Sequence, residues 1–200
     1  MFLNGTQVGS SYTDSNNYGA SAACRIGADD DGSPNAYVNG FMSNVRVVKG
    51  TALYTSTFTP STTPLTAVSG TSLLTCQSAR FIDTSSNAFT ITVNGDTKVQ
   101  PYNPFYTASI ASNGGSMYFD GSGDYLSVPS APNMNFGTSN WTIECWVYVS
   151  TRTANYPLIF GNNRGSFTTD ALAITNSNSD SASYNDKFVV AWGSGGWSSP

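Results

Sequence analysis

The sequence predicts an all-β protein built as an antiparallel sandwich, on three observations. Apolar residues make up 39% of the 200 residues and charged residues only 10%, well below the usual quarter of a globular chain. The 11 Tyr and 11 Phe, with Val and Thr, suit half-buried strands, and the abundant Asn, Gly, Ser and Asp suit turns. No long window places apolar residues at helical spacing among good helix formers. The length fits one sandwich domain, which buries roughly 70% of its unfolded surface.

Asn-Gly pairs at 4–5, 39–40 and 94–95 predict hairpin tips, because both central residues of a type I′ turn need positive φ. The first pair has only Phe2 and Leu3 before it, which predicts that the sequence begins inside a domain. A fourth hairpin is expected over 116–129, where apolar residues flank a Gly/Asp turn. Further strands are expected at 40–54, 72–77, 88–93, 142–149 and 187–192. Composition predicts a loop over 60–70 and a turn over 83–87.

Two of these segments carry a family resemblance. Residues 116–129 read Ser-Met-Tyr-Phe-Asp-Gly-Ser-Gly-Asp-Tyr-Leu-Ser-Val-Pro, and residues 40–54 read Gly-Phe-Met-Ser-Asn-Val-Arg-Val-Val-Lys-Gly-Thr-Ala-Leu-Tyr. They resemble the beginning and the end of the concanavalin A-like, laminin G-like jelly roll, in the version repeated in tandem in structural proteins of tailed phages. Here the end comes first. The resemblance therefore implies a jelly-roll sandwich whose strand order is permuted or truncated.

The resemblance also implies a domain organisation. Residues 1–65 would be the C-terminal third of one copy, 66–70 a linker, and 71–200 the N-terminal two-thirds of a second copy. The two parts would either pack together as one permuted sandwich, which we favour, or form two incomplete sandwiches whose free edges promote association into an oligomer. The deciding expectation is that the strand around Val45 to Val48 runs alongside the strand around Tyr118.

Charge and residue content exclude several function classes. The net charge is -4, and the eight Lys and Arg are scattered, whereas nucleic-acid binding needs clustered cations to neutralise phosphates. No apolar run approaches the roughly 20 residues of a membrane-spanning helix, and no secretion signal is recognisable at the start of the sequence. The absence of histidine excludes Ser-His-Asp and Cys-His catalysis and most catalytic zinc sites.

A glycoside hydrolase of this fold would need paired carboxylates on one strand face. Glu144 is the only glutamate, and its same-face neighbours Trp146 and Tyr148 cannot serve as the partner acid. We therefore expect a protein that is not an enzyme. The three cysteines are odd in number and lack metal-site spacing. Cys145 is expected as a small core residue, and a Cys24–Cys76 disulfide stays open beside the favoured reduced state.

Calcium is the more plausible chemistry, since related sandwiches hold it at their rims through Asp, Asn and backbone oxygens. Two oxygen-rich loops are candidates, one with Asp29, Asp30 and Asp31 and one with Asp120 and Asp124. The alternative is that Asp and Gly simply build turns. That alternative is favoured for both loops, and more strongly for Asp120 and Asp124.

A sugar site would need exposed aromatic faces beside hydrogen-bonding groups. The candidates are Trp197 and Trp192, with Tyr184, Asn185 and Asp186 in the preceding loop. For each tryptophan, packing in the core is the competing and more common role. Trp146 in particular is expected in the core, because Cys145 and Val147 flank it.

The leading functional hypothesis is a non-enzymatic, lectin-like adhesion module of a phage tail fibre or similar structural protein. It would lie on a virion or extracellular surface and bind host-surface glycan or another virion protein, without inserting into a membrane. The alternative is a structural spacer repeat that makes only protein–protein contacts.

Overall fold

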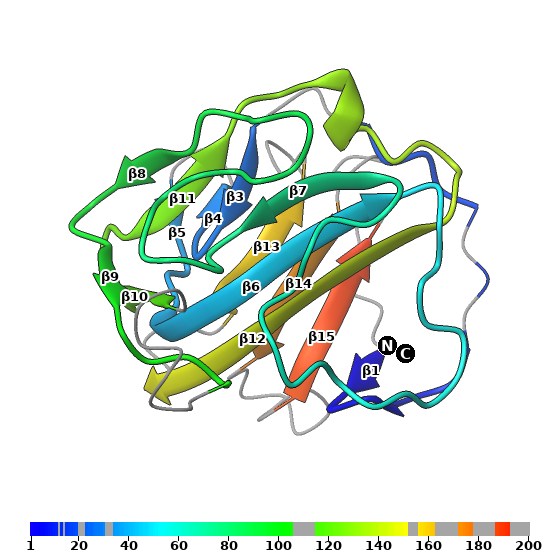
Figure 1. The fold of residues 1–200 in the computed structure, drawn as a ribbon, viewed down its shortest axis with the longest axis horizontal. Coiled ribbons are helices and arrows are strands. Elements are labelled where there is room, and N and C mark those ends of the chain that lie inside the picture. The colour runs from blue at the N-terminus through cyan, green and yellow to red at the C-terminus, as the bar shows by residue number, and fades with distance from the viewer. Residues whose placement is uncertain are drawn as a thin grey trace.

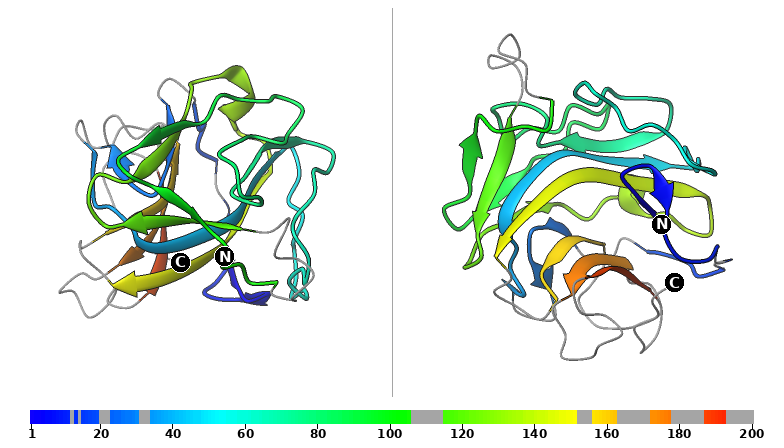
Figure 2. Two further views of the ribbon diagram at one scale, coloured as in Figure 1. Left: turned by 60° about the vertical axis from the view of Figure 1, so that its left-hand side comes forward. Right: turned by 90° about the horizontal axis from the view of Figure 1, so that it is seen from below.

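The computed structural model describes residues 1–11, 13, 15–19, 23–30, 34–105, 115–151, 156–162, 172–177 and 187–192. Within these residues the protein is an antiparallel β-sandwich, as predicted: two main sheets face each other across an apolar core (Figures 1 and 2). The one helical element described is the short 3₁₀ turn Pro132–Met134. Accordingly, no helix in the described ranges has the length and apolar character needed to cross a membrane.

The first sheet is built around β6 (Asn39–Lys49). Along one side β6 pairs with β12 (Trp141–Thr151) over its whole length. Along the other side it pairs first with β10 (Ser116–Asp120) and then with β7 (Thr71–Thr75). The short strand β9 (Lys98–Gln100) adds to the free side of β10. Two strands from different parts of the sequence thus share one edge of β6.

The second sheet contains six strands, in the order β15 (Lys187–Trp192), β14 (Leu172–Ser177), β13 (Leu158–Asn162), β3 (Cys24–Ile26), β11 (Tyr125–Val128) and β8 (Thr92–Asn94). Two small ribbons lie outside the main sheets: β1 (Phe2–Leu3) with β2 (Thr6–Gln7), and β4 (Asp29–Asp30) with β5 (Pro34–Asn35). In Figure 2, β6 and β12 curve over the second sheet, so their concave side faces the core.

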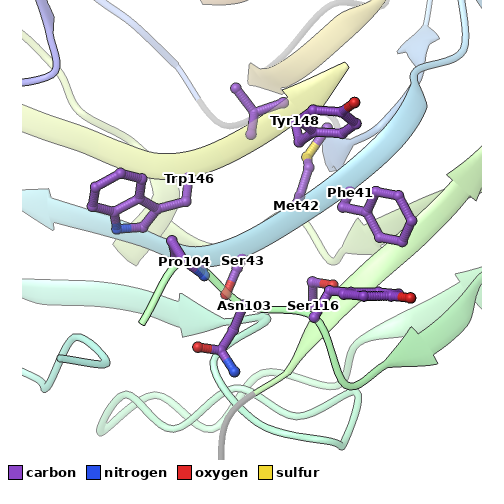
Figure 3. Close-up of a pocket in the computed structure, with 10 residues that line it drawn as sticks. Phe41, Met42, Ser43, Asn103, Pro104, Ser116, Trp146 and Tyr148 are labelled. Atoms are coloured by element: carbon purple, nitrogen blue, oxygen red, sulfur yellow. The ribbon is translucent and has the colours of Figure 1, made fainter. Parts of the chain in front are cut away.

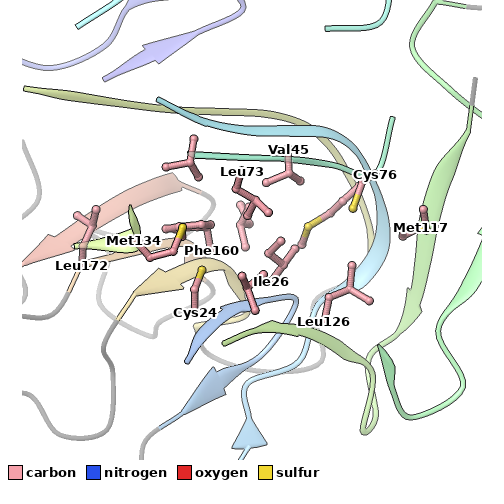
Figure 4. Close-up of a cluster of buried hydrophobic side chains, with 14 of the residues drawn as sticks. Cys24, Ile26, Val45, Leu73, Cys76, Met117, Leu126, Met134, Phe160 and Leu172 are labelled. Carbon is pink, nitrogen blue, oxygen red and sulfur yellow. The ribbon is translucent and has the colours of Figure 1, made fainter. Parts of the chain in front are cut away.

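The core lies between the two sheets, and this explains why inward-facing apolar residues alternate with outward-facing residues along the strands. From β6, Met42, Val45 and Val47 point into it and meet Ile26 and Phe160 of the second sheet (Figure 4). Burial of each such side chain stabilises the fold by about 1.5–3 kcal/mol. Cys24 and Cys76 are buried in the same cluster, and all three cysteines are free thiols.

The deciding expectation about neighbouring segments is confirmed. Tyr118 of β10 lies opposite Phe41 of β6, and Asp120 lies opposite Asn39. Val45 to Val48 belong to the same strand, but at that level β6 pairs with β7 and β12 instead of β10. Segments from either side of the loop over 66–70 therefore share one sheet. The origin of the two parts in two copies of one family stays a prediction.

A bulge at Asn44 explains how β6 exchanges one neighbour for another. Asn44 has φ 56°, and Arg46 lies opposite Glu144 whereas Ser43 lies opposite Trp146, so β6 carries one extra residue here. Asparagine tolerates this left-handed conformation better than most residues. Its backbone N–H donates to the Cys76 carbonyl (3.0 Å), at the end of β7.

The predicted hairpin over 116–129 is wrong. β10 pairs within the first sheet and β11 within the second, so the turn at 121–124 carries the chain from one sheet to the other. The Asn94-Gly95 turn makes the same kind of crossing between β8 and β9. Turn chemistry determines that the chain reverses, but it does not determine which sheet edge each arm joins.

Of the other Asn-Gly pairs, the first is a hairpin tip as predicted. Asn4 and Gly5 both have positive φ, and Leu3 pairs with Thr6. Asn39 and Gly40 instead lie inside β6. Gly40 is required there because a Cβ atom would collide with the carbonyl oxygen of Tyr148 on the neighbouring strand. Gly40 therefore allows the backbones of β6 and β12 to approach closely, and it does not form a turn.

The remaining local predictions are largely confirmed. The predicted strand 72–77 corresponds to β7, which ends two residues earlier at Thr75, while 142–149 lies within β12 and 187–192 forms β15. The strand expected over 88–93 is reduced to β8 at its end. The turn over 83–87 is organised by the buried Asp83, whose carboxylate accepts the backbone N–H groups of Leu74 (3.0 Å), Ser85 (2.9 Å) and Phe89 (2.9 Å).

Candidate functional site

A groove of about 610 Å³ lies on the outer face of the first sheet, on the side away from the core (Figure 3). Its lining comes from β6, β12, the start of β10 and the loop that follows β9: Phe41, Met42, Ser43, Tyr102, Asn103, Pro104, Ser116, Trp146, Val147 and Tyr148. Four of these ten residues are aromatic, and none carries a charge.

Strand alternation places the aromatic side chains. Successive residues of a strand point to opposite faces, so Val147 of β12 packs against the core while its neighbours point outward. The expectation that Trp146 belongs to the core is therefore wrong: it lines the groove on the outer face, together with Tyr148. The apolar neighbours Cys145 and Val147 indicate that one face of β12 is buried. They do not indicate that the opposite face, which carries Trp146, is buried as well.

Phe41 is the centre of the aromatic lining. Its ring lies 5.0 Å from Tyr118, 5.7 Å from Tyr102 and 6.2 Å from Tyr148, measured between centroids. Tyr118 and Tyr148 lie directly opposite Phe41 on the two neighbouring strands, so these rings form a row across the sheet. Tyr102 and Tyr148 remain 68% and 67% exposed. Two large aromatic surfaces thus face solvent beside a partly buried ring.

The loop over 101–105 forms the second wall of the groove. Phe105 is buried and meets Trp146 edge-on, with 5.6 Å between the ring centroids. The Asn103 side chain closes the turn, because its Oδ1 accepts the backbone N–H of Phe105 at 2.9 Å. The edge-on contact fixes Trp146 against the loop, which holds Tyr102 near Phe41.

Two serine hydroxyls line the groove in different states. Ser43 is fully engaged: its Oγ donates to the Gly115 carbonyl (2.8 Å) and accepts from the Asn44 amide (2.7 Å). Ser116 is 2% exposed, and its Oγ is buried without a hydrogen-bond partner within the described residues. An unpaired buried hydroxyl costs about 1–3 kcal/mol, so Ser116 is an unusual feature of the groove.

Further along the same outer face lies a buried ion pair. Arg46 of β6 donates from Nε to Glu144 of β12 (2.8 Å) and from Nη1 to the Thr66 carbonyl (2.7 Å). Tyr54 donates its hydroxyl to the other Glu144 oxygen at 2.9 Å. Burial, and secondly the Glu144 charge, raises the pKa of Tyr54 above its usual 10.0. Both carboxylate oxygens of Glu144 are engaged in holding the 51–68 segment onto the sheet.

Three acidic residues gather where the chain crosses between the sheets. One carboxylate oxygen from each of Asp96, Asp120 and Asp124 lies within 4.8 Å of the others. Asp120 and Asp124 are among the residues predicted from the sequence, whereas Asp96 is not. The 94–97 turn and the 121–124 turn both carry the chain from one sheet to the other, and this brings Asp96 close to Asp120 and Asp124. The sequence shows each turn, but it does not show that both turns join the same two sheets.

The hydrogen-bond donors around this cluster show whether its carboxylates are free to bind a calcium ion. Asp124 is fully buried and accepts the backbone N–H groups of Asp96 (2.7 Å) and Asp120 (3.0 Å). Asp120 accepts the N–H of Ser122 (2.7 Å), and the ammonium group of Lys98 lies 2.7 Å from the Asp96 carboxylate. Each carboxylate therefore already has a partner from the protein. The arrangement favours the turn-building alternative.

The other predicted site residues lie partly outside the described residues. Asp29 is 5% exposed and lies with Asp30 in β4, while Asp31 lies outside the described residues. Trp192 is the last residue of β15, where only its backbone is described. Trp197, Tyr184, Asn185 and Asp186 also lie outside the described residues. The predicted sugar site thus stays a prediction, and the described residues that line the aromatic groove are others.

Comparison with protein-family models, with curated proteins and with solved structures finds no match to this chain. Function is therefore inferred from the geometry of the groove and from the chemistry of the residues that line it.

Proposed function

We propose that this protein is a carbohydrate-binding module and that the aromatic groove on the first sheet is its binding site. The observation that carries the proposal is the pair of exposed tyrosine rings, Tyr102 and Tyr148, on either side of Phe41. Sugar rings present apolar C–H faces and polar hydroxyl edges. A groove that offers aromatic faces together with serine, tyrosine and amide groups matches both kinds of surface.

The exposure of these tyrosines argues against a purely structural role. Large aromatic side chains normally bury most of their surface, and clustered exposed ones mark interaction sites. Packing within the sheet does not require either ring, because Phe41 already contacts the half-buried Tyr118 at 5.0 Å. The adhesion role, the surface location and the host glycan expected from the sequence fit such a groove and belong to the same proposal.

The test is a binding titration of the wild-type protein and two variants, Tyr102→Ala and Tyr148→Ala, against a glycan array and against oligosaccharides that the array selects. We expect each variant to lose at least about tenfold in affinity, the equivalent of 1.4 kcal/mol, with little change in melting temperature. Ile82→Ala serves as the control, because Ile82 is an exposed apolar residue (37%) outside the groove lining.

Two outcomes would count against the proposal. If the array reveals no ligand for the folded protein, the structural spacer becomes the better explanation. If a glycan binds equally well to wild type and to both tyrosine variants, then binding takes place elsewhere, and the sequence candidates around Trp197 become the next residues to test.

A further inference from the structure

We propose that the groove selects an uncharged saccharide and that the Ser116 hydroxyl is the buried hydrogen-bonding group that distinguishes one neutral sugar from another. This inference rests on the proposed function and names its ligand class. It uses two observations that the exposed tyrosines do not supply. The described lining residues carry no charge, and the Ser116 hydroxyl has no hydrogen-bond partner among the described residues.

The electrostatics of the groove exclude a charged ligand as the best one. None of the ten lining residues is ionisable at neutral pH, so a carboxylate, sulfate or amine would lose hydration without gaining a counter-charge. The nearby Arg46 cannot supply one, because its guanidinium is already bound to Glu144 and to the Thr66 carbonyl. An uncharged ring avoids this desolvation penalty while gaining the aromatic contacts.

Ser116 supplies the polar contact. It lies at the first position of β10, under the loop that carries Tyr102, and its hydroxyl has no partner within the described part of the chain. A serine side chain moves between staggered rotamers, so the hydroxyl can turn toward a ligand that enters the groove. No hydrogen bond between described residues must be broken, so a correctly placed sugar hydroxyl gains the full interaction.

The ligand class is tested with pairs of probes that differ in charge. Chitohexaose is compared with its cationic de-N-acetylated form, and hexagalacturonate with its neutral methyl ester, beside cellohexaose and maltohexaose. We expect the neutral member to bind more tightly in every pair that binds. Its affinity should also be the same at about 0.01 M and about 1 M salt, over which the Debye length falls from about 30 Å to about 3 Å.

The serine is tested with Ser116→Ala. We expect the affinity for the best neutral probe to fall about fivefold, the size of one net hydrogen bond, while the melting temperature stays equal or rises. The matched variant is Ser43→Ala, measured for stability only. It removes a hydroxyl that is already bonded inside the protein, so it should lower the melting temperature.

The outcomes separate this inference from the proposed function. Tighter, salt-sensitive binding of the charged probes that still requires Tyr102 would overturn the ligand class and leave the groove as the site. Unchanged affinity of Ser116→Ala, or a loss of stability like that of Ser43→Ala, would overturn the role of the serine. Failure of every probe to bind overturns both.

Discussion

Asp124 shows how a single residue can shape a region of this protein. Its buried carboxylate joins two turns that lie 28 residues apart, through hydrogen bonds from the Asp96 and Asp120 backbone. Desolvation raises its pKa above the usual 3.8, although the two backbone N–H groups act in the opposite direction. Asp96 differs from it: the exposed Lys98 pair holds the pKa of Asp96 below the usual value.

These opposite shifts predict opposite dependences of stability on pH. Because the folded pKa of Asp124 is raised, the folded state binds this proton more tightly than the unfolded chain does. Its contribution to stability is present below the unfolded pKa and is lost as the pH rises through the folded pKa. We therefore expect the melting temperature of wild type, relative to Asp124→Asn, to be more favourable in acid than near neutrality.

Asp96→Asn provides the control for this comparison. The lowered pKa of Asp96 gives a contribution that is present above the unfolded pKa and is lost as the pH falls through the folded pKa. Relative to this variant, wild type should become less stable in acid. The measurement is a series of thermal melts across the acidic range, and equal slopes for the two variants would contradict the assignment.

At the scale of elements, β6 and β12 are joined by the Arg46–Glu144 pair as well as by their backbone ladder. The two side chains lie opposite each other and are only 7% and 19% exposed. Removing one partner leaves a buried, uncompensated charge, whereas replacing both with apolar residues of similar size is often neutral or stabilising.

We expect Arg46→Met to lower the free energy of unfolding by about 3 kcal/mol and the melting temperature by about 6–12 °C. The double variant Arg46→Met/Glu144→Leu should recover most of that loss. Urea titration and thermal melts of wild type, both single variants and the double variant form a complete cycle. If the double variant is as unstable as the sum of the single ones, the ion pair is not what couples these two positions.

At the scale of the whole molecule, the two parts of the sequence interlock. β6 comes from the first 65 residues, and its partners β7, β10 and β12 all come after residue 70. The core likewise combines Met42 and Val45 from the first part with Met117 and Phe160 from the second. This arrangement predicts one cooperative unit, because neither part completes the first sheet alone.

The exposed loop over 66–68 allows a direct test. A specific protease site introduced there should be cut without separating the two fragments, because β6 remains bonded along both of its edges. We expect the cut protein to elute from a sizing column at the position of the intact chain and to unfold in a single transition. Two fragments that elute separately under native conditions would show that the parts are independent.

The fold class and the position of most strands follow from local sequence patterns alone. Propensity and alternation are local properties, so β7, β12 and β15 could be located from their own residues, and so could the turn that Asp83 organises. The Asn4-Gly5 hairpin was predictable for the same reason, since positive φ is a requirement of the turn itself. The adjacency of β6 and β10 was also predicted, from the family resemblance.

Which sheet each strand joins, and which faces remain open, depends instead on long-range packing. β10 and β11 follow each other across a short turn, yet they belong to different sheets, because β10 pairs with β6 and β9 whereas β11 pairs with β3 and β8. Alternation placed Trp146 and Tyr148 on one face of β12, but it could not show that this face forms the groove. That outcome depends on packing between residues far apart in the sequence, such as Phe105 against Trp146.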